Sequence, residues 1–253
     1  MVRYLLVRGM LAGLLAGVLS FAFAWLVGEQ YVDRAIAFET YVEYTVHHEK
    51  PEVELVSRQL QSTAGLATGT LIFGVAMGGI FALVFSAVYG RMKPYPARGL
   101  AALLGALAFT AVYLVPFLKY PPTPPAVGDP ETIRQRTYFY LALIVISVLS
   151  MILAVGLRPR LVPRFGEWNA TLLAMAGYVA IAAICFATLP GVDEVPQREL
   201  PSVVAAVSGD DVTFPPAVLW GFRMSSLGLQ VVVWTTIALV FGQLAQHLTA
   251  GER

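Results

Sequence analysis

Charge is scarce in this 253-residue chain: only 13% of its residues are Asp, Glu, Lys or Arg, whereas 57% are hydrophobic. This composition excludes an ordinary soluble domain and indicates an integral membrane protein. The long apolar stretches contain no Asp or Glu at all. A proton relay of intramembrane carboxylates, the usual device of proton-coupled transporters, is therefore not expected.

Cysteine is almost missing as well. The single Cys185 excludes an intrachain disulfide and any CxxC site, and its apolar surroundings favour a small buried core residue. The chain also lacks a GxxxxGK[ST] nucleotide loop, an HExxH motif and a recognisable nucleophile–base arrangement, so we do not expect an enzyme. No basic cluster is interleaved with aromatic residues, so nucleic acid is not an expected partner.

The chain does contain a series of long uncharged stretches. Each has about 20 residues or more, enough to cross the ~30 Å of membrane hydrocarbon as a helix. The stretches are 9–28, 59–90, 99–118, 137–157, 168–192 and 224–251. We therefore predict an all-α polytopic bundle of about six transmembrane helices, forming one membrane domain over 1–253. The predicted spans are 5–28, 60–90, 99–118, 137–157, 168–190 and 216–246, and the predicted structured external loops are 29–59, 119–136 and 191–215.

Six crossings would place alternate connections on opposite faces, and the carboxylates then fall almost entirely on one of them. That face would hold Glu29, Asp33, Glu39, Glu43, Glu49, Glu52, Glu54, Asp129, Glu131, Asp193, Glu194, Glu199, Asp210 and Asp211. The other face would keep only Glu167 and Glu252, together with densely placed Lys and Arg in short segments. Positive charge marks the cytoplasmic side, so we predict both termini in the cytoplasm and the acidic face outside, where it would attract cations.

Glycines recur at a spacing of four in the first two spans, and this pattern lines one helix face with small residues that let helices pack closely in lipid. The residues are Gly9, Gly13, Gly17, Gly65, Gly69, Gly74 and Gly78. A cleaved signal peptide is the alternative for the first span, because Ala22-Phe23-Ala24 resembles a cleavage site. Its apolar run is longer than a typical signal core, so we expect the span to be retained.

A candidate metal site lies in the first external loop. Residues 31–48 contain no Gly or Pro, so a helix there is expected, and it would place Glu39, Glu43 and His47 on one face. His48 and Glu49 come directly after it. Carboxylates combined with imidazoles suit divalent first-row transition ions such as cobalt, nickel or zinc. The alternative is a solvated acidic face of an external helix.

Arg223 is the one charge inside an apolar run, about 10 Å from Pro216 at the rise of a helix. Intramembrane charges are costly and usually paired. We therefore predict a gate or a structural ion pair with Asp129, Glu131 or a carboxylate of the 193–211 loop. The alternative is an arginine that extends to the outer surface and anchors the helix.

Several segments together resemble the predicted cobalt transporter family CbtA, particularly its longer actinobacterial-type members. They are VGEQYVDRAIAFE (27–39), LVSRQLQSTAGL (55–66), YLVPFLKYPPTPPAVGDPETI (113–133), EWNATLLA (167–174) and FPPAVLWGFRMSSLGLQ (214–230) with Trp234. This chain departs from the family pattern in a shorter His/Glu run, HHEKPEVE, and in a longer last external loop at about 198–211.

The resemblance implies a multi-pass protein of the bacterial inner membrane that takes up cobalt for cobalamin synthesis. It also implies a small single-span partner, the B-type component of the transporter, and leaves a homo-oligomer open. Our first hypothesis is the membrane subunit of a divalent metal uptake transporter, with Co²⁺ as the transported ion and no permanently bound cofactor. The alternative, favoured by the apolar spans, is a non-transporting scaffold or accessory component that packs against partner membrane proteins.

Overall fold

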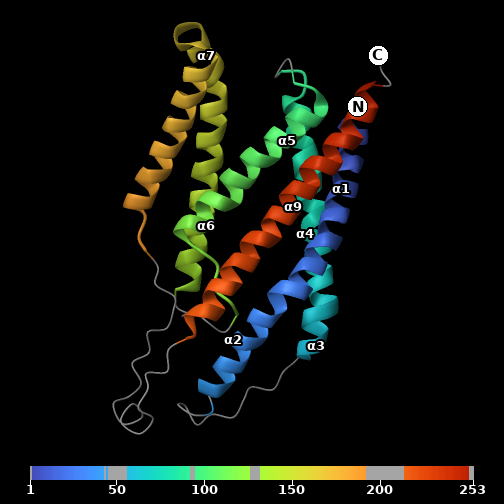
Figure 1. Cartoon of the computed structure of the whole chain (residues 1–253), viewed down its shortest axis with the longest axis vertical. Coiled ribbons are helices and arrows are strands. Elements are labelled where there is room, and N and C mark those ends of the chain that lie inside the picture. Colours follow the sequence, from blue (N-terminus) through green and yellow to red (C-terminus); the bar gives the residue numbers. More distant parts are fainter. Residues whose placement is uncertain are drawn as a thin grey trace. The chain divides into compact units, whose positions relative to one another are not determined.

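The computed structural model describes residues 2–42, 44, 56–91, 95–125, 132–191 and 214–250 (Figure 1). Helices account for most of these residues, and the described part contains no strand. The chain, predicted as one domain, divides into two compact units. Unit 1 consists of Met1–Ala106, Thr123–Val127 and Val195–Arg253, and unit 2 of Leu107–Pro122 and Gly128–Glu194.

Unit 1 is built from long helices. An unbroken run joins α1 (Val2–Phe23), a π-helical turn (Ala24–Gly28) and α2 (Glu29–Val42). A second run joins α3 (Arg58–Leu60), a π-helical turn (Gln61–Gly65) and α4 (Leu66–Val88). The unit is completed by α5 (Ala97–Ala108) and α9 (Pro216–Ala250). The acidic segment after the first span is thus helical as far as Val42, as its lack of Gly and Pro predicted.

Unit 2 continues from α5 through a π-helical stretch (Phe109–Leu114) into α6 (Val115–Lys119). It then forms α7 (Ile133–Thr188), which reverses direction at Gly166, where φ is +74° and ψ is 166°. Only glycine adopts such a conformation without steric cost. Figure 1 shows the two arms of α7 running back along each other as a hairpin.

The number of membrane crossings is obtained from helix directions. Among the residues that the structure describes, five helices are long and apolar enough to span a membrane, and α7, at 56 residues, is one of them. Within unit 1, Gly105 of α5 packs on Ala238 and Ala101 packs on Gly242, so α5 and α9 run antiparallel. Antiparallel spans must be separated by an even number of crossings, so α7 counts as two. The count of described helices is therefore consistent with a bundle of about six transmembrane helices.

Helices α1 and α4 pack at very short range through their glycines. A Cβ atom on Gly13 would meet the backbone of Gly74 at 2.8 Å and the Cα of Gly78 at 3.0 Å, and one on Gly9 would collide with Ala82 and the Gly78 carbonyl. Gly17 lies against Thr70 and Leu71 in the same way. Such contact without side chains between the backbones is typical of glycine-rich helix pairs in lipid.

Gly65 and Gly69, which the sequence also predicted at a helix–helix contact, pack against no other described helix. A Cβ on Gly69 would meet nothing within 4 Å, and one on Gly65 would meet only the carbonyl of Leu60 in its own helical run. The described structure thus uses the glycine face of α4 from Gly74 onward and leaves its first turn open.

Aromatic rings hold α1 and α2 against α9. Phe23 packs on Gly228, Tyr31 on Gly221, and Phe38 stacks edge to face with Phe214 at 5.2 Å between ring centroids. On the α9 side these contacts are seven residues apart each time, from Gly228 to Gly221 in α9 and then to Phe214, which lies two residues before that helix. Along the run of α1 and α2, the aromatic residues are eight apart from Phe23 to Tyr31 and seven apart from Tyr31 to Phe38. The step of eight, from Phe23 to Tyr31, contains the π-helical turn 24–28. A π turn holds one residue more than an α turn, so it accommodates the extra residue without displacing the residues after it.

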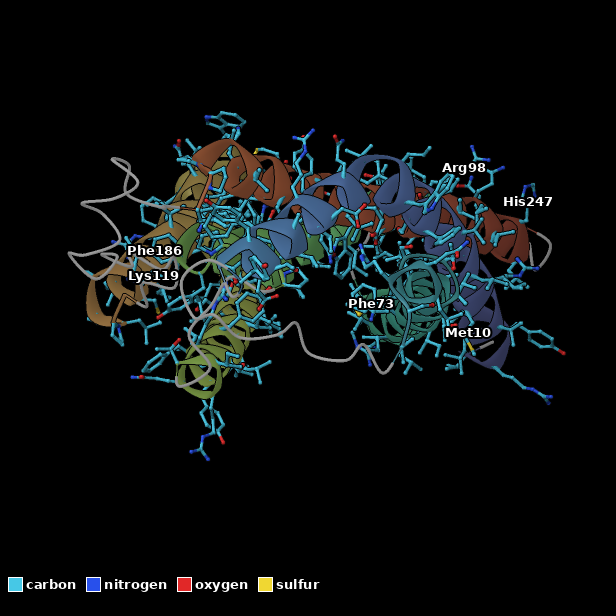
Figure 2. All side chains as sticks on the ribbon, turned by 90° about the horizontal axis from the view of Figure 1, so that it is seen from below. Met10, Phe73, Arg98, Lys119, Phe186 and His247 are labelled. Carbon is cyan, nitrogen blue, oxygen red and sulfur yellow. The ribbon has the colours of Figure 1, made fainter. Side chains whose placement is uncertain are left out.

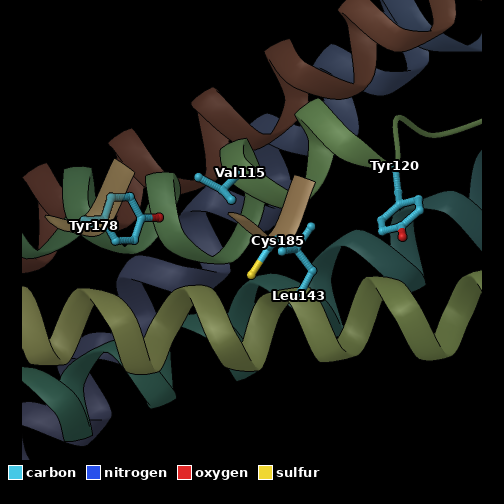
Figure 3. Close-up of a cluster of buried hydrophobic side chains, with 5 residues drawn as sticks. All are labelled: Val115, Tyr120, Leu143, Tyr178 and Cys185. Carbon is cyan, nitrogen blue, oxygen red and sulfur yellow. The ribbon is translucent and has the colours of Figure 1, made fainter. Parts of the chain in front are cut away.

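Unit 2 has its own core (Figure 3). Val115, Tyr120, Leu143, Tyr178 and Cys185 are all buried and contributed by α6, the residue after it and both arms of α7. The Ser147 and Tyr178 hydroxyls are 2.8 Å apart and join the two arms. Cys185 is a free, buried thiol, as its apolar context predicted. The outward faces of the spans in both units carry exposed leucine, isoleucine and valine, which is the surface expected to contact lipid.

Candidate functional site

The predicted metal-binding residues lie at the end of α2. Glu39 is half-buried in its last turns, whereas Glu43, His47, His48 and Glu49 lie outside the described residues. Among the residues that the structure describes, no three His, Cys, Asp or Glu side chains come close enough to hold a metal ion. The predicted metal set thus remains a prediction, and the described structure shows how the helix that leads to it is held.

An ion cluster anchors the start of that helix. Arg58 in α3 forms ion pairs with both Glu29 and Asp33, which are one turn apart on α2. Its Nη2 contacts the Glu29 carboxylate and lies 3.0 Å from Asp33 Oδ1, and its Nε donates to the same Asp33 oxygen at 3.1 Å. The Glu29 side chain is 15% exposed and that of Arg58 24%, so this pair is shielded from water more than most surface pairs.

This ion cluster of Glu29, Asp33 and Arg58 closes the two ends of the first acidic loop. It ties the beginning of α2 to the beginning of α3, while the chain between the two helices carries the predicted metal ligands. One positive charge meets two carboxylates, so the cluster keeps a net negative charge. Sequence reasoning missed this pairing, although the spacing of four between Glu29 and Asp33 indicates a shared helix face.

A small apolar cluster supports α2 from the other side. Ala35, Phe214 and Val218 are buried together, with Tyr31 and Phe38 packed against them. These contacts join α2 to the start of α9. Helix α2 is therefore fixed both by charge and by apolar packing, and the acidic segment it carries continues from a rigid base.

The predicted gate is only partly described. Arg223 is half-buried in α9, two turns from the start of that helix. The predicted partners, Asp129, Glu131 and the carboxylates of the 193–211 loop, lie outside the described residues. Two residues further on, Ser225 is buried and donates its hydroxyl hydrogen bond to the carbonyl of Phe222. The ion pair therefore stays a prediction.

Unit 2 contains a second polar constellation, at the end of α6. Lys119 donates to the carbonyl of Phe186 at 2.8 Å, and the Tyr120 hydroxyl donates to the carbonyl of Pro190 at 2.8 Å. Figure 2 shows Lys119 and Phe186 beside each other. Lys119 thus caps the C-terminal end of α7, where the last carbonyls lack partners and the helix dipole favours a cation. Burial raises the pKa of the Tyr120 hydroxyl, which favours its neutral, donating form.

The same constellation fixes the start of the proline-rich segment. Arg136, near the beginning of α7, donates to the carbonyl of Pro121 at 2.5 Å. Lys119 and Tyr120 thus bind the carbonyls of Phe186 and Pro190, and Arg136 binds the carbonyl of Pro121, the first residue of this segment. The sequence alone could not assign these donors to backbone carbonyls.

Between the arms of α7 lies a small cavity of about 10 Å³, close to the lower limit for one water molecule. Its lining includes the Ser147, Ser150 and Tyr178 hydroxyls and the Cys185 thiol. The Ser147 and Tyr178 hydroxyls bond each other, and Ser150 donates to the Ile146 carbonyl. This cavity is too small for a hydrated cation, and its hydroxyl groups are satisfied within unit 2.

Comparison with known families gives one match that covers nearly the whole chain. The family model described as "Probable cobalt transporter subunit (CbtA)" matches residues 2–246. Comparisons with curated proteins and with solved structures gave no match. The matched range includes every helix described above except the last residues of α9.

Proposed function

Because the chain belongs to the CbtA family of probable cobalt transporter subunits, we propose that it takes up divalent cobalt across the bacterial inner membrane as the multi-pass component of a larger transporter. The family match over residues 2–246 carries this proposal. The five long apolar helices of the described residues agree with it, since such a component must traverse the bilayer.

The first acidic loop is the proposed place of cobalt capture. Glu39, Glu43, His47, His48 and Glu49 supply the carboxylate and imidazole ligands that first-row divalent ions accept. The ion cluster at Arg58 and the apolar contacts with α9 hold the helix that leads into this loop. The remaining external carboxylates would raise the local concentration of divalent cations at the outer face. With this acidic loop outside, we propose that both termini lie in the cytoplasm.

We propose that this chain does not form the cobalt path alone. Its spans contain no carboxylate, and the cavity between the α7 arms is about 10 Å³. We therefore propose that a small single-span partner, of the B type, completes the path, with a second copy of this chain as the other candidate. The same observation favours the second candidate function, an accessory scaffold that packs against the partner that moves the ion.

Cobalt uptake into proteoliposomes tests the proposal. The purified chain would be reconstituted alone and with a candidate single-span partner, and Co²⁺ entry would be measured. We expect the triple variant E43A/H47A/H48A to lose uptake, while the control E167A, which removes a carboxylate near the reversal of α7, keeps it. Folded protein that carries no Co²⁺ with or without the partner would overturn the transport role and favour the scaffold.

A binding measurement separates capture from transport. Co²⁺ affinity of the chain in detergent should fall in E43A/H47A/H48A and stay unchanged in E167A. If uptake is lost in the triple variant while binding is retained, cobalt capture lies elsewhere on the chain.

A further inference from the structure

The reversal of α7 forms a basic tip that neither the cobalt role nor the family match explains. Its sequence, RPRLVPRFGEW, spans Arg158–Trp168 and contains three arginines and one carboxylate. The arginines are Arg158, Arg160 and Arg164, and the carboxylate is Glu167. The tip therefore carries an excess of positive charge at one end of a hairpin whose arms are uncharged over 137–157 and 168–188.

The tip is held in a defined shape. Pro159 and Pro163 restrict its backbone within the last turns of the first arm, and Gly166 supplies the reversal at φ +74°. Arg158 Nε donates to Thr171 Oγ1 across the turn at 2.8 Å, and that hydroxyl donates to the Glu167 carbonyl at 2.8 Å. Arg158 thus stabilises the turn, whereas Arg160 and Arg164 lie on its surface.

One of those two arginines stands beside an exposed aromatic ring. Arg160 and Arg164 are exposed, and the Arg164 guanidinium lies over the ring of Phe165 at 5.5 Å from its centroid. Phe165 is 40% exposed and Trp168 is 74% exposed. Tryptophan and arginine side chains of this kind gather where hydrocarbon meets the headgroups of a membrane.

The tip is also continuous with the lipid-facing surface. Exposed apolar side chains line both arms of the hairpin as it leaves the tip: Leu149, Ile152 and Leu153 on the first, and Leu172, Leu173 and Met175 on the second. A hairpin whose arms lie in hydrocarbon places its tip at the level of the headgroups. There the arginines meet phosphate groups, with which the planar guanidinium forms paired hydrogen bonds.

We propose that the α7 tip, through Arg160, Arg164 and Trp168, binds the headgroups of anionic phospholipids. Charge complementarity favours an anionic lipid over a neutral one. The exposed Trp168 and Phe165 favour a lipid over free phosphate, because a soluble anion gains nothing from apolar rings next to it. This binding would fix unit 2 at the membrane surface independently of cobalt.

Lipid titration of the purified full-length chain in detergent tests this proposal. Phosphatidylglycerol, phosphatidylcholine and inorganic phosphate would be added separately, and bound lipid would be counted by native mass spectrometry. We expect tight, salt-sensitive binding of phosphatidylglycerol alone. The double variant R160Q/R164Q should bind it about thirtyfold more weakly, since each arginine near an anionic surface contributes roughly a fivefold gain.

The matched control is R3Q/R34Q, which removes the same charge from two exposed arginines of unit 1. It should keep the affinity for phosphatidylglycerol. Equal losses in both double variants, equal binding of the two lipids, or competition by inorganic phosphate would each overturn the proposal.

A third variant provides a test that does not remove any charge from the tip. W168A keeps all charges of the tip and should weaken phosphatidylglycerol binding severalfold while leaving its salt dependence unchanged. Unchanged affinity in W168A would refute the role of the aromatic anchor, and circular dichroism would verify that each variant retains its helices.

Discussion

The glycine contact between α1 and α4 gives the sharpest test of the fold. In Gly17→Ala, the new Cβ would lie 2.8 Å from the Thr70 carbonyl oxygen and 2.9 Å from the Leu71 Cα. Both atoms belong to the α4 backbone and cannot rotate away. The helices must separate by about 0.6 Å to reach an ordinary contact of 3.4 Å, and a gap of this size removes about a quarter or more of the dispersion energy of the atoms involved.

We therefore expect Gly17→Ala to lower the free energy of unfolding by about 1–3 kcal/mol, the usual cost of overpacking. Thermal unfolding in a fixed detergent, followed by circular dichroism, measures this. Gly69→Ala is the matched control, because the same added methyl group meets nothing within 4 Å. Removing a glycine from a helix stabilises it by roughly 0.5–1 kcal/mol, so the control should be neutral or stabilised. Equal destabilisation of both variants would refute the close contact.

Three further predictions concern polar contacts. Arg58→Gln should release the start of α2 at a cost of about 1 kcal/mol, seen as faster proteolysis between α2 and α3; an unchanged cleavage rate would contradict the anchoring role. Tyr120→Phe loses the bond to Pro190 and about 1 kcal/mol. Burial raises the pKa of Tyr120 above 10.0 in the folded chain. The resulting stabilisation is fully present below pH 10.0 and is lost as the pH rises through the folded pKa. The loss of unfolding free energy at alkaline pH should therefore be smaller in the variant than in the parent chain. Ser147→Ala should cost about 1–3 kcal/mol in thermal unfolding, because it leaves the Tyr178 hydroxyl without its partner; no loss would show that the two arms do not depend on this bond.

The sequence predicts the spans well because the bilayer imposes a simple rule. A helix in hydrocarbon must be long and uncharged, so the charges that interrupt the apolar stretches mark the connections. The start of α9 at Pro216 and the helical character of 29–42 are set by equally local signals, a proline at the first turn and a run without Gly or Pro. The reversal between the fourth and fifth spans lies at Gly166, within the Pro- and Arg-rich connection that separates them.

The contacts between distant segments could not be predicted from the sequence. Arg58 pairs with carboxylates 25 and 29 residues earlier in the chain, and many other carboxylates were equally available to it. Lys119 and Tyr120 bind carbonyls about 70 residues away, and a carbonyl has no sequence signature. The glycine pattern predicted close helix packing, but only the fold distinguishes Gly74, which is covered by α1, from Gly69, which is open.

The π-helical turn at Ala24–Gly28 has a consequence for the length of the chain. The rings of Phe23 and Tyr31 must each reach a particular glycine of α9, and the glycines are seven residues apart while the rings are eight. The fold therefore fixes the two ends of this turn in space but not the number of residues between them. A one-residue deletion here would leave an ordinary α-helix with both ring contacts kept, whereas the same deletion in α1 would rotate the adjoining residues out of register with α9. Insertions and deletions among relatives in this helix should accordingly gather at 24–28.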